Sequence, residues 1–299
     1  MEKILITGIS GFLGWNLVHR LKNQYQIYGT CLDNPVSIPG VETFTVDLSD
    51  WSKIERLCQA VNPTVIVHTA AYSNPDYCEL HHKEALTLNT FATRELAKSA
   101  NRLGSRLIYT STDFVFDGKR GDYSEADDPA PINYYGKTKY LGELEITNHC
   151  SHYVTLRIGT LYGRGNDIRP NFFETMEKQL LAGKKQPCIV DQYRTFLFVE
   201  DAVQATSQLV SEKALKGLFH LGGPEKASRF QFAEKLCATL GAPASLIEKV
   251  RLAESASSAA RPPDCSLNST KIKRALELKL SSITEALVRL CDHPGNRKV

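Results

Sequence analysis

The stretch ITGISGFLGWNL, residues 6–17, decides the fold of this 299-residue chain. It spaces Gly8, Gly11 and Gly14 as G-x-x-G-x-x-G, directly after an apolar run at 3–7 and at the start of an amphipathic segment. Glycines at such a strand-to-helix turn let the backbone approach a pyrophosphate, whose charge is stabilised at the helix N-terminus. In this context the pattern predicts a dinucleotide-binding unit, and the alternative is a tight turn without a ligand.

Apolar runs and amphipathic segments alternate strictly through the first half of the chain. Parallel strands covered on both faces are apolar nearly throughout, so the alternation predicts βαβ units and a doubly wound parallel sheet, an α/β fold of the Rossmann type. The predicted strands are residues 3–7, 25–32, 41–46, 64–70, 105–111 and 153–159, and the predicted helices are 12–23, 51–61, 79–103 and 134–148.

The alternation loosens after Gly159. We expect a smaller, α-rich C-terminal lobe that binds substrate, built from residues 160–194 and 221–299. Residues 195–220 are expected to return to the dinucleotide-binding domain of residues 1–159. The patterns predict helices at 171–184, 200–212, 229–240 and 281–292, a strand at 217–223, a loop at 254–266 and a frayed end at 294–299.

Composition and charge narrow the classes of function. With 42% hydrophobic residues, 23% charged residues and a net charge of +3, the chain is typical of a soluble globular protein. It has no basic run with interleaved aromatic residues, so nucleic acid is not an expected partner. No apolar stretch approaches the roughly 20 residues of a membrane span. The N-terminus enters a strand pattern at once, so we expect no signal peptide and a cytoplasmic location.

Eight cysteines are scattered without a C-x-x-C pair, which is typical of reduced thiols that pack as small hydrophobic groups. Potential metal ligands gather at Cys78, His81 and His82, with Asp76 and Glu79 nearby. No second group of ligands accompanies them at metal-site spacing. A polar helix start is therefore the better interpretation, and no metal is predicted.

Two acidic residues bear on the choice of dinucleotide. Asp33 lies 19 residues beyond Gly14, near the end of the second strand, where a carboxylate accepts hydrogen bonds from the adenosine ribose and repels a 2′-phosphate. Asn-Pro follows it, so a turn cap is the alternative. We therefore place NAD ahead of NADP. The sequence DLSD places Asp47 and Leu48 beside the adenine, with a helix cap as the alternative for Asp47.

The reaction end is predicted from the fifth strand and the helix that follows it. Ligands of doubly wound sheets bind at the carboxyl ends of the strands, and the segment YTSTDFVFDG ends this strand in hydroxyl groups. NYYGKTKYLGE (133–143) then places two tyrosines beside two lysines. Residues three or four apart share a helix face, so spacing alone allows both Tyr135 with Lys139 and Tyr134 with Lys137.

Taken together, these motifs resemble the extended short-chain dehydrogenase/reductase superfamily, which carries TGxxGxxG, a Ser/Thr-bearing strand end and Tyr-x-x-x-Lys in this order. Only Tyr135 starts that spacing. STDFVFDG, YGKTKYLGE, HTAAYSNPDYCE, ALTLN, LRIGTLYG and DQ (191–192) look like the dTDP-4-dehydrorhamnose reductase branch. The late ARPPDCSLN (260–268) resembles that branch's Ala-Arg-Arg-Pro-x-x-Ser-x-Leu element, with Arg261 retained and the second arginine replaced. That departure bears on the substrate more than on the reaction.

The resemblance implies NAD(P)H-dependent reduction of the 4-keto group of a nucleotide-sugar, with dTDP-4-dehydrorhamnose to dTDP-rhamnose as the first candidate. It assigns catalysis to Thr112, Tyr135 and Lys139. The tyrosine donates a proton to the alkoxide, the lysine favours the phenolate, and the threonine orients the carbonyl. Dehydratases of the superfamily carry Asp-Glu after the threonine, whereas Asp113 is followed here by Phe114, which disfavours dehydration.

The resemblance also assigns binding residues. Those expected to contact the cofactor are Gly8, Ser10, Gly11, Phe12, Leu13, Gly14, Asp33, Asp47, Leu48, Thr69, Ala70, Ala71, Asn89, Thr110, Ser111, Tyr135 and Lys139. Those expected to contact the substrate are Asp76, Thr112, Asp113, Gln192, Arg194 and Arg261. Besides Asp33 and Asp47, three of these residues have alternatives. Ser111 is then a strand-end hydroxyl without function, Asn89 a buried asparagine bonded to backbone, and Arg194, the candidate diphosphate clamp, a solvated surface arginine.

Other functions stay open at this point. One is another enzyme of the superfamily, an epimerase or a reductase of a different keto sugar. Another is a non-catalytic, cofactor-binding regulatory subunit, because the beta subunit of methionine adenosyltransferase shares the fold and the SSD/STD-x-VFDG region. The resemblance also allows a homodimer. Reductases of this branch can form dimers through a metal-linked C-terminal contact, although no residue pattern in this sequence predicts such a metal site.

Overall fold

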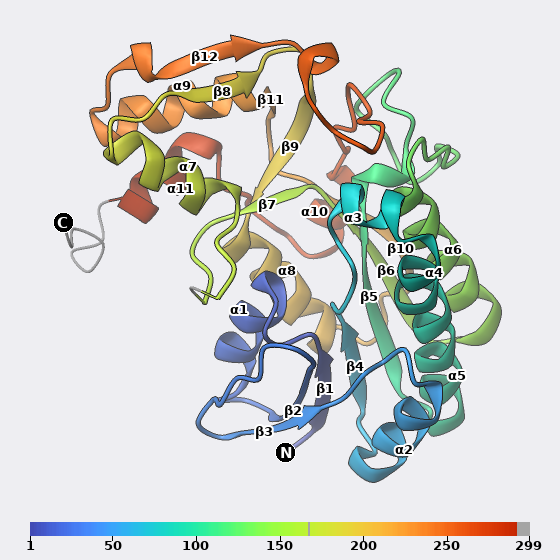
Figure 1. The fold of residues 1–299 in the computed structure, drawn as a ribbon. Helices are drawn as coiled ribbons and strands as arrows, with labels where there is room; N and C mark the ends of the chain where they lie inside the picture. The colour runs from blue at the N-terminus through green and yellow to red at the C-terminus, as the bar shows by residue number, and fades with distance from the viewer. Residues whose placement is uncertain (167, 292–299) are drawn as a thin grey trace.

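The computed structural model describes residues 1–166 and 168–291 and is built around a seven-stranded parallel sheet (Figure 1). The strand order is β10-β6-β5-β4-β1-β2-β3, with a reversal between β1 and β4 where ligands of such sheets bind. The doubly wound α/β fold expected from the sequence is therefore confirmed. The strands of this sheet are β1 (Lys3–Thr7), β2 (Gln26–Cys31), β3 (Val41–Thr45), β4 (Val65–His68), β5 (Arg106–Thr112), β6 (Tyr153–Ile158) and β10 (Gly217–Leu221).

Helices cover both faces of this sheet because its strands are apolar on both sides (Figure 1). In β1, Ile4 and Ile6 pack into one hydrophobic cluster, whereas Leu5 packs into another on the opposite face. The first cluster includes apolar residues of α1 and α8, and the second includes those of α2, α5 and α6. These helices are α1 (Phe12–Leu21), α2 (Trp51–Val61), α5 (Thr93–Leu103), α6 (Tyr134–His149) and α8 (Val199–Ser211).

The single helix predicted over 79–103 is wrong in detail. Helix α3 already begins at Pro75, since proline suits a first helical position and the Asn74 side chain accepts hydrogen bonds from the Asp76 and Tyr77 N–H groups. The chain then breaks at His81 before it continues to Leu103. The pieces are α3 (Pro75–Leu80), α4 (His82–Leu86), a π-helical turn η1 (Thr87–Ala92) and α5.

The smaller lobe contains more strand than the sequence indicated. Its helices are α7 (Phe172–Leu181), α9 (Arg229–Leu240), α10 (Thr270–Ala275) and α11 (Ile283–Cys291). Two small sheets accompany them, one of β7 (Thr160–Tyr162), β9 (Tyr193–Phe198) and β11 (Lys226–Ser228), the other of β8 (Gln186–Ile189) and β12 (Ile247–Val250). Short 3-10 turns lie at η2 (Asp113–Val115), η3 (Ala244–Leu246) and η4 (Leu252–Glu254). Strands this short carry too little alternation to be recognised in the sequence.

Segment 195–220 divides between the two sheet systems. Strand β10 and helix α8 belong to the large sheet and its cover, whereas β9 pairs with β7 and β11 in the smaller lobe. The domain boundaries themselves stay a prediction. The predicted frayed end at 294–299 lies outside the described residues.

The cysteines behave as small hydrophobic groups. Seven of them are buried, and none of the eight forms a disulfide in the part of the chain described. Within that same part, no helix is long and apolar enough to cross a bilayer.

Candidate active site

The glycine loop lets the backbone approach a ligand closely. Gly8 follows β1 with a φ of 76°, and its N–H donates to the Thr30 carbonyl at 2.9 Å. A Cβ at Gly8 would lie 2.9 Å from the backbone of Ala70, and a Cβ at Gly14 would lie only 2.3 Å from the Gly8 carbonyl oxygen. Larger side chains would therefore displace the turn and the start of the helix.

Helix α1 begins at this loop with its first N–H groups available to a ligand. Gly11 is the N-cap residue and supplies no side-chain cap. Gly11 is exposed, Ser10 and Phe12 are partly exposed, and Leu13 is buried. Uncapped N–H groups and the helix dipole favour an anion here, so the residues present fit a dinucleotide pyrophosphate.

The end of β4, with Thr69, Ala70 and Ala71, lies beside the glycine loop, and the predicted cofactor contacts of these residues stay a prediction. The Thr69 hydroxyl donates to the Thr7 carbonyl at 2.6 Å, and the Ala70 N–H contacts the Thr7 hydroxyl at 3.3 Å. Thr69 and the two alanines are all partly exposed. These contacts hold the two strand ends in a fixed relation.

The two predicted acidic residues lie near Tyr72, which the sequence did not single out. Burial and then the charges of Glu84, Asp33 and Asp47 raise the pKa of Tyr72. Asp33 is exposed, and no hydrogen bond to its carboxylate is present within residues 1–166 and 168–291, so the turn-cap alternative is not observed. Ser49 N–H donates to Asp47 at 2.8 Å.

Asp47 and Leu48 both precede helix α2, which begins at Trp51. The N-cap of α2 is Asp50, so Asp47 does not cap this helix. Leu48 is buried in the hydrophobic core, which leaves its backbone as the part that can face a ligand.

The start of α6 places Tyr135 beside Thr112. Asn133 caps the helix by accepting a hydrogen bond from the Gly136 N–H at 2.9 Å. A Cβ at Gly136 would lie 2.1 Å from the Phe114 carbonyl oxygen, so the helix packs directly on the segment after β5. The Thr112 hydroxyl lies near the Tyr135 phenol, and the Phe114 ring meets that of Tyr135 edge-on at 5.7 Å.

Burial dominates the acidity of Tyr135. It raises the pKa of the phenol, the nearby Thr112 hydroxyl opposes the shift, and the charges of Asp113 and Cys78 add to it. The lowering of the Tyr135 pKa that was expected from Lys139 is therefore not observed in the chain alone, because a phenolate loses its hydration in this cleft. Tyr135 is protonated at neutral pH.

Lys139 is a buried cation one helical turn beyond Tyr135. Its Nζ lies 4.1 Å from the centroid of the Tyr109 ring, and within the described residues it donates no hydrogen bond. Burial lowers the pKa of Lys139 to about 7, against the opposing charges of Glu143 and Cys78. The ammonium is thus close to its titration point and has donors available to a ligand.

Ser111 does not belong to the central group of Thr112, Tyr135 and Lys139. Its hydroxyl donates to Glu143 Oε1 at 2.5 Å, and Arg157 pairs with the same carboxylate through an Nη2–Oε2 contact of 2.7 Å. Thr112, its neighbour on the opposite face of β5, is the hydroxyl that reaches Tyr135. Thr110 is buried and donates to the His68 carbonyl at 3.0 Å. Ser111 matches the structural alternative, and cofactor contacts of both residues stay predictions.

Asn89 also matches its alternative. It is fully buried in the π-helical turn, where its side chain accepts from the Tyr72 N–H at 2.9 Å and donates to the Tyr72 carbonyl at 3.0 Å. A further bond of 3.0 Å reaches the Thr138 hydroxyl in α6. A π turn often marks a functional segment. Here it fastens the loop after β4 to the helix that carries Tyr135.

Predicted substrate residues pair with one another across the two lobes. Arg194 Nε lies 3.6 Å from Asp113 Oδ2, and its Nη2 donates to the Pro262 carbonyl at 3.0 Å. Arg194 is buried, so it is not the solvated arginine of the alternative. Burial raises the pKa of Asp113 to about 6, against the effect of Arg194. Gln192 contacts the same Pro262 carbonyl at 3.4 Å.

A second pair joins the late loop to α3. Arg261 Nη2 donates to Asp76 Oδ2 at 2.5 Å, and Asp76 Oδ1 accepts from the Ala259 N–H at 2.9 Å. The Asn133 side chain donates to the Ala260 carbonyl at 2.8 Å. The loop of residues 259–263 is therefore tied to the start of both α3 and α6.

Tyr134 and Lys137 lie outside the central group. The Tyr134 ring stacks on His82 with centroids 3.7 Å apart, and Lys137 is exposed.

The potential metal ligands also stay apart. In the described part of the chain, no three His, Cys, Asp or Glu side chains gather as a metal site.

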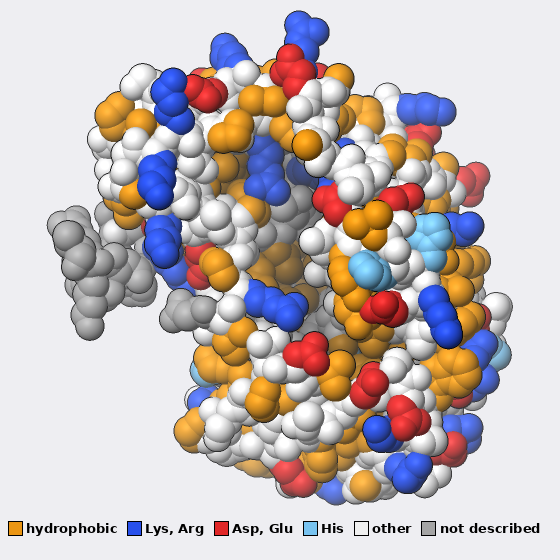
Figure 2. Space-filling view, viewed as in Figure 1, with side chains coloured by type: hydrophobic (Ala, Val, Ile, Leu, Met, Phe, Trp, Pro, Cys, Tyr) orange, Lys and Arg blue, Asp and Glu red, His pale blue; other side chains and the backbone are white. Residues whose placement is uncertain are grey.

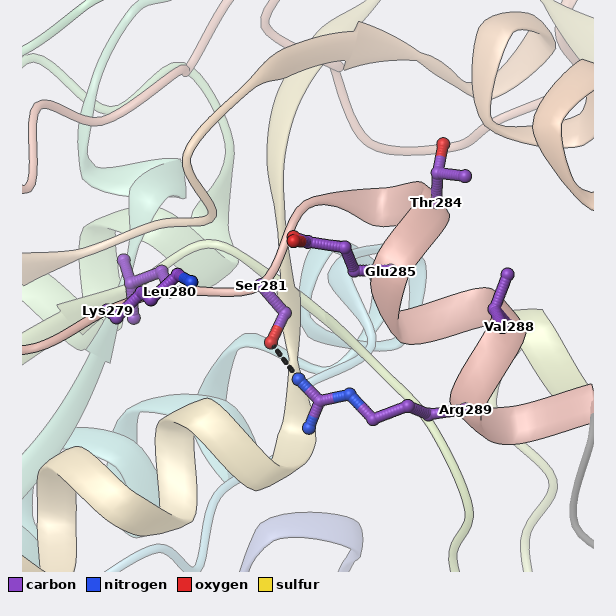
Figure 3. A pocket seen from close by; sticks show the side chains of 7 residues that line it. All are labelled: Lys279, Leu280, Ser281, Thr284, Glu285, Val288 and Arg289. Carbon is purple, nitrogen blue, oxygen red and sulfur yellow. Dashed lines mark hydrogen bonds between the residues drawn. The ribbon is translucent and has the colours of Figure 1, made fainter.

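Figure 2 shows the molecule hollowed between the large sheet and the smaller lobe, with an apolar floor and Lys and Arg side chains on the wall beneath the lobe. A separate hollow of about 490 Å³ lies at α11 and contains none of the predicted site residues (Figure 3). Its lining residues are Lys279, Leu280, Ser281, Thr284, Glu285, Val288 and Arg289.

The contacts of Phe114 and Arg229 were not predicted, because they join residues that are distant in the sequence. Phe114 packs between Tyr135 and Arg194, whose Cζ lies 5.0 Å from its ring centroid. Arg229 stacks on the Phe172 ring at 4.0 Å. A charged residue at the first position of α9 was visible in the sequence, but no local pattern predicted its contact with Phe172.

Known proteins resemble this chain over nearly its whole length. In Bacillus anthracis, a dTDP-4-dehydrorhamnose reductase solved in complex with NADP is 28% identical, with a TM-score of 0.86 over 97% of this chain and 98% of that one. A probable low-salt glycan biosynthesis reductase, Agl14 of Haloferax volcanii, is 28% identical over 95% of this chain and 96% of its own length.

A third relative has a different description. Methionine adenosyltransferase 2 subunit beta of Pongo abelii is 32% identical over 83% of this chain and 75% of its own length. The family described as RmlD substrate binding domain matches residues 1–295. The chain therefore belongs to the RmlD substrate-binding domain family.

Proposed function

We propose that the protein is an NAD(P)H-dependent reductase of the 4-keto group of a nucleotide-sugar, with dTDP-4-dehydrorhamnose to dTDP-rhamnose as the first candidate reaction. One observation carries the proposal. The Tyr135 phenol lies beside the Thr112 hydroxyl at the carboxyl end of β5, with the buried and unbonded Lys139 ammonium one helical turn away. The relatives described as reductases support it.

A nicotinamide dinucleotide would supply the hydride when bound. The glycine loop, the end of β4 and Lys139 would hold it, and the exposed Asp33 supports NAD over NADP because a carboxylate repels a 2′-phosphate. The preference is tested by the dissociation constants of NADH and NADPH. Replacing Asp33→Ala should weaken the binding of NADH and strengthen the binding of NADPH. An unchanged ratio of the two dissociation constants would refute this role of Asp33.

The proton chemistry follows from the residues around Tyr135. A reduced carbonyl becomes an alkoxide, which is a stronger base than a phenolate, so the protonated phenol can donate to it despite its raised pKa. The Thr112 hydroxyl is in place to bond the same oxygen. The phenolate left on Tyr135 is stabilised by the Lys139 ammonium, which recovers its charge as pH falls below about 7.

Elimination of water is not supported by this site. It requires an acid and a base, and the position after Asp113 is the apolar Phe114. Asp113 is itself engaged with Thr112 and Arg194. A simple carbonyl reduction uses the groups present, whereas an epimerase is a weaker alternative.

A non-catalytic regulatory subunit is the second candidate. The observation that favours it is the 32% identity to methionine adenosyltransferase 2 subunit beta. In that case the chain would bind a dinucleotide without turnover and change the kinetics of a partner enzyme. The cytoplasmic location and the homodimer also stay proposals.

A turnover assay decides between the two candidates. Purified full-length protein is incubated with 4-keto sugars of dTDP, GDP and UDP, each with NADH and with NADPH. We expect cofactor oxidation with at least one dTDP-linked sugar. Binding of cofactor without oxidation across the whole panel would overturn the reductase proposal.

A further inference from the structure

Arg229 is a cation of the smaller lobe to which the proposed chemistry assigns no role. It is the first residue of α9 and directly follows β11, in which Ala227 pairs with Arg194 of β9. Within residues 1–166 and 168–291, no carboxylate and no hydrogen-bond acceptor contacts its guanidinium group. The side chain is only partly exposed. Its five N–H donors are thus unpaired and incompletely hydrated.

An aromatic cluster fixes this guanidinium group. Arg229 Cζ lies 4.0 Å from the centroid of the Phe172 ring. Phe172 packs in turn against Phe196 at 5.5 Å and Phe232 at 5.1 Å. A guanidinium stacked on a ring that is itself packed against two other rings loses little freedom when it binds a ligand.

The positive charges of two other arginines affect Arg229, and each of these arginines already forms an ion pair with a carboxylate. Arg194 pairs with Asp113 and Arg261 pairs with Asp76. Burial, and then the positive charges of Arg194 and Arg261, lower the pKa of Arg229 to about 10. Three guanidinium groups against two carboxylates leave one positive charge uncompensated. Figure 2 shows Lys and Arg side chains on the wall of the hollow beneath the smaller lobe.

We infer that Arg229 binds a phosphate oxygen of a nucleoside diphosphate in the cleft, with Arg194 and Arg261 adding to the positive field. The planar fork of a guanidinium matches two phosphate oxygens, and hydrogen bonds between charged groups are among the strong ones. The nature of the ligand rests on the proposed function, whereas the anion site rests on the arginine cluster alone.

Calorimetric titration of the full-length protein with dTDP, UDP and GDP tests the inference without turnover. Arg229→Gln should weaken the binding of whichever nucleoside diphosphate binds the wild-type protein by about 10- to 100-fold. The binding of NADH and the unfolding midpoint should not change. Arg229→Lys keeps the charge but not the planar fork of donors, so its affinity for the nucleoside diphosphate should fall by about 3- to 10-fold. This variant replaces Arg229→Gln in the test if the glutamine variant does not fold.

The matched control is Arg94→Gln in α5. Arg94 also stacks on a phenylalanine, with Cζ 4.9 Å from the Phe91 ring centroid, but it is paired with Glu95. This variant should bind nucleoside diphosphates as wild type does.

The outcomes separate the two proposals. Equal binding of the three diphosphates by wild type and Arg229→Gln would overturn the inference, as would no binding by wild type. A selective loss of diphosphate binding in a protein that oxidises no NADH or NADPH would leave the anion site standing and the reductase proposal refuted. Turnover with an unchanged KM for the nucleotide-sugar in Arg229→Gln would refute the anion site alone.

Discussion

The two walls of the cleft are built on different physical principles. On the wall formed by the large sheet, function follows from local structure: the glycine loop, the Thr112 strand end and the Tyr135 helix start each lie within a single βα unit. On the wall formed by the smaller lobe, charges are paired over long sequence distances, as Arg194 with Asp113 and Arg261 with Asp76. The first wall is set by backbone geometry and the second by tertiary contacts, so the two should respond differently to substitution.

The largest effect is expected at the proton donor. Replacing Tyr135→Phe removes the hydroxyl next to Thr112 and should lower kcat by about 100- to 10,000-fold in the turnover assay. NADH and NADPH affinities should change little, because the ring remains. Tyr134→Phe is the matched control one residue earlier, since Tyr134 stacks on His82 outside the central group. Undiminished turnover of Tyr135→Phe would refute the donor assignment.

A smaller but still large effect is expected at the glycine loop. Gly8→Ala places a Cβ 2.9 Å from the Ala70 backbone and should weaken dinucleotide binding by at least about tenfold, since overpacking costs about 1–3 kcal/mol. Gly104→Ala is the control. Gly104 also has a positive φ, of 67°, but open space around it, so the variant should lose about 1–2 kcal/mol of stability and no affinity. Equal affinity losses in both variants would contradict this view of the loop.

The difference between the two walls also explains which residues could be predicted from the sequence. Gly8, Gly11 and Gly14 act through backbone conformation, and Tyr135 with Lys139 through helix spacing, so local patterns were enough to place them. The apolar strands β1 to β6 were placed within about two residues for the same reason.

The smaller lobe gave fewer local signals. The pairing of Arg261 with Asp76 spans nearly the whole chain, and the stacking of Arg229 on Phe172 links two helices that no local pattern connects. Neither follows from spacing. Likewise, Ser111 and Thr112 carry equivalent hydroxyls, and only the alternation of β5 against α6 sends one to Glu143 and the other to Tyr135.

The buried Lys139 should be visible in the pH dependence of stability. Its pKa is about 7 in the folded chain and is 10.5 for an ordinary lysine, so between these values the unfolded chain binds one more proton. The unfolding free energy of wild type should therefore rise with pH by about 1.4 kcal/mol per unit between pH 7 and 9, relative to Lys139→Met. Urea unfolding at several pH values measures this. Parallel curves for the two proteins would show that Lys139 is not held in an unfavourable environment.

The smallest effect is expected for the ion pair across the lobes. Asp76 and Arg261 are partly exposed, so solvent screens their attraction. A double-mutant cycle with Asp76→Asn and Arg261→Gln should give a coupling energy of about 0.5–1 kcal/mol in urea unfolding. A coupling near zero would mean that the late loop is held by its backbone contacts alone.

Transfer of deuterium from labelled NADH or NADPH tests the central claim most directly. The wild-type protein is incubated with the labelled cofactor and dTDP-4-dehydrorhamnose, and the sugar product is examined by mass spectrometry. We predict that one deuterium enters the product, and that Tyr135→Phe slows this transfer by about 100- to 10,000-fold while still binding both ligands. Binding of both ligands by wild type without any deuterium in the sugar would contradict the account and favour a regulatory subunit.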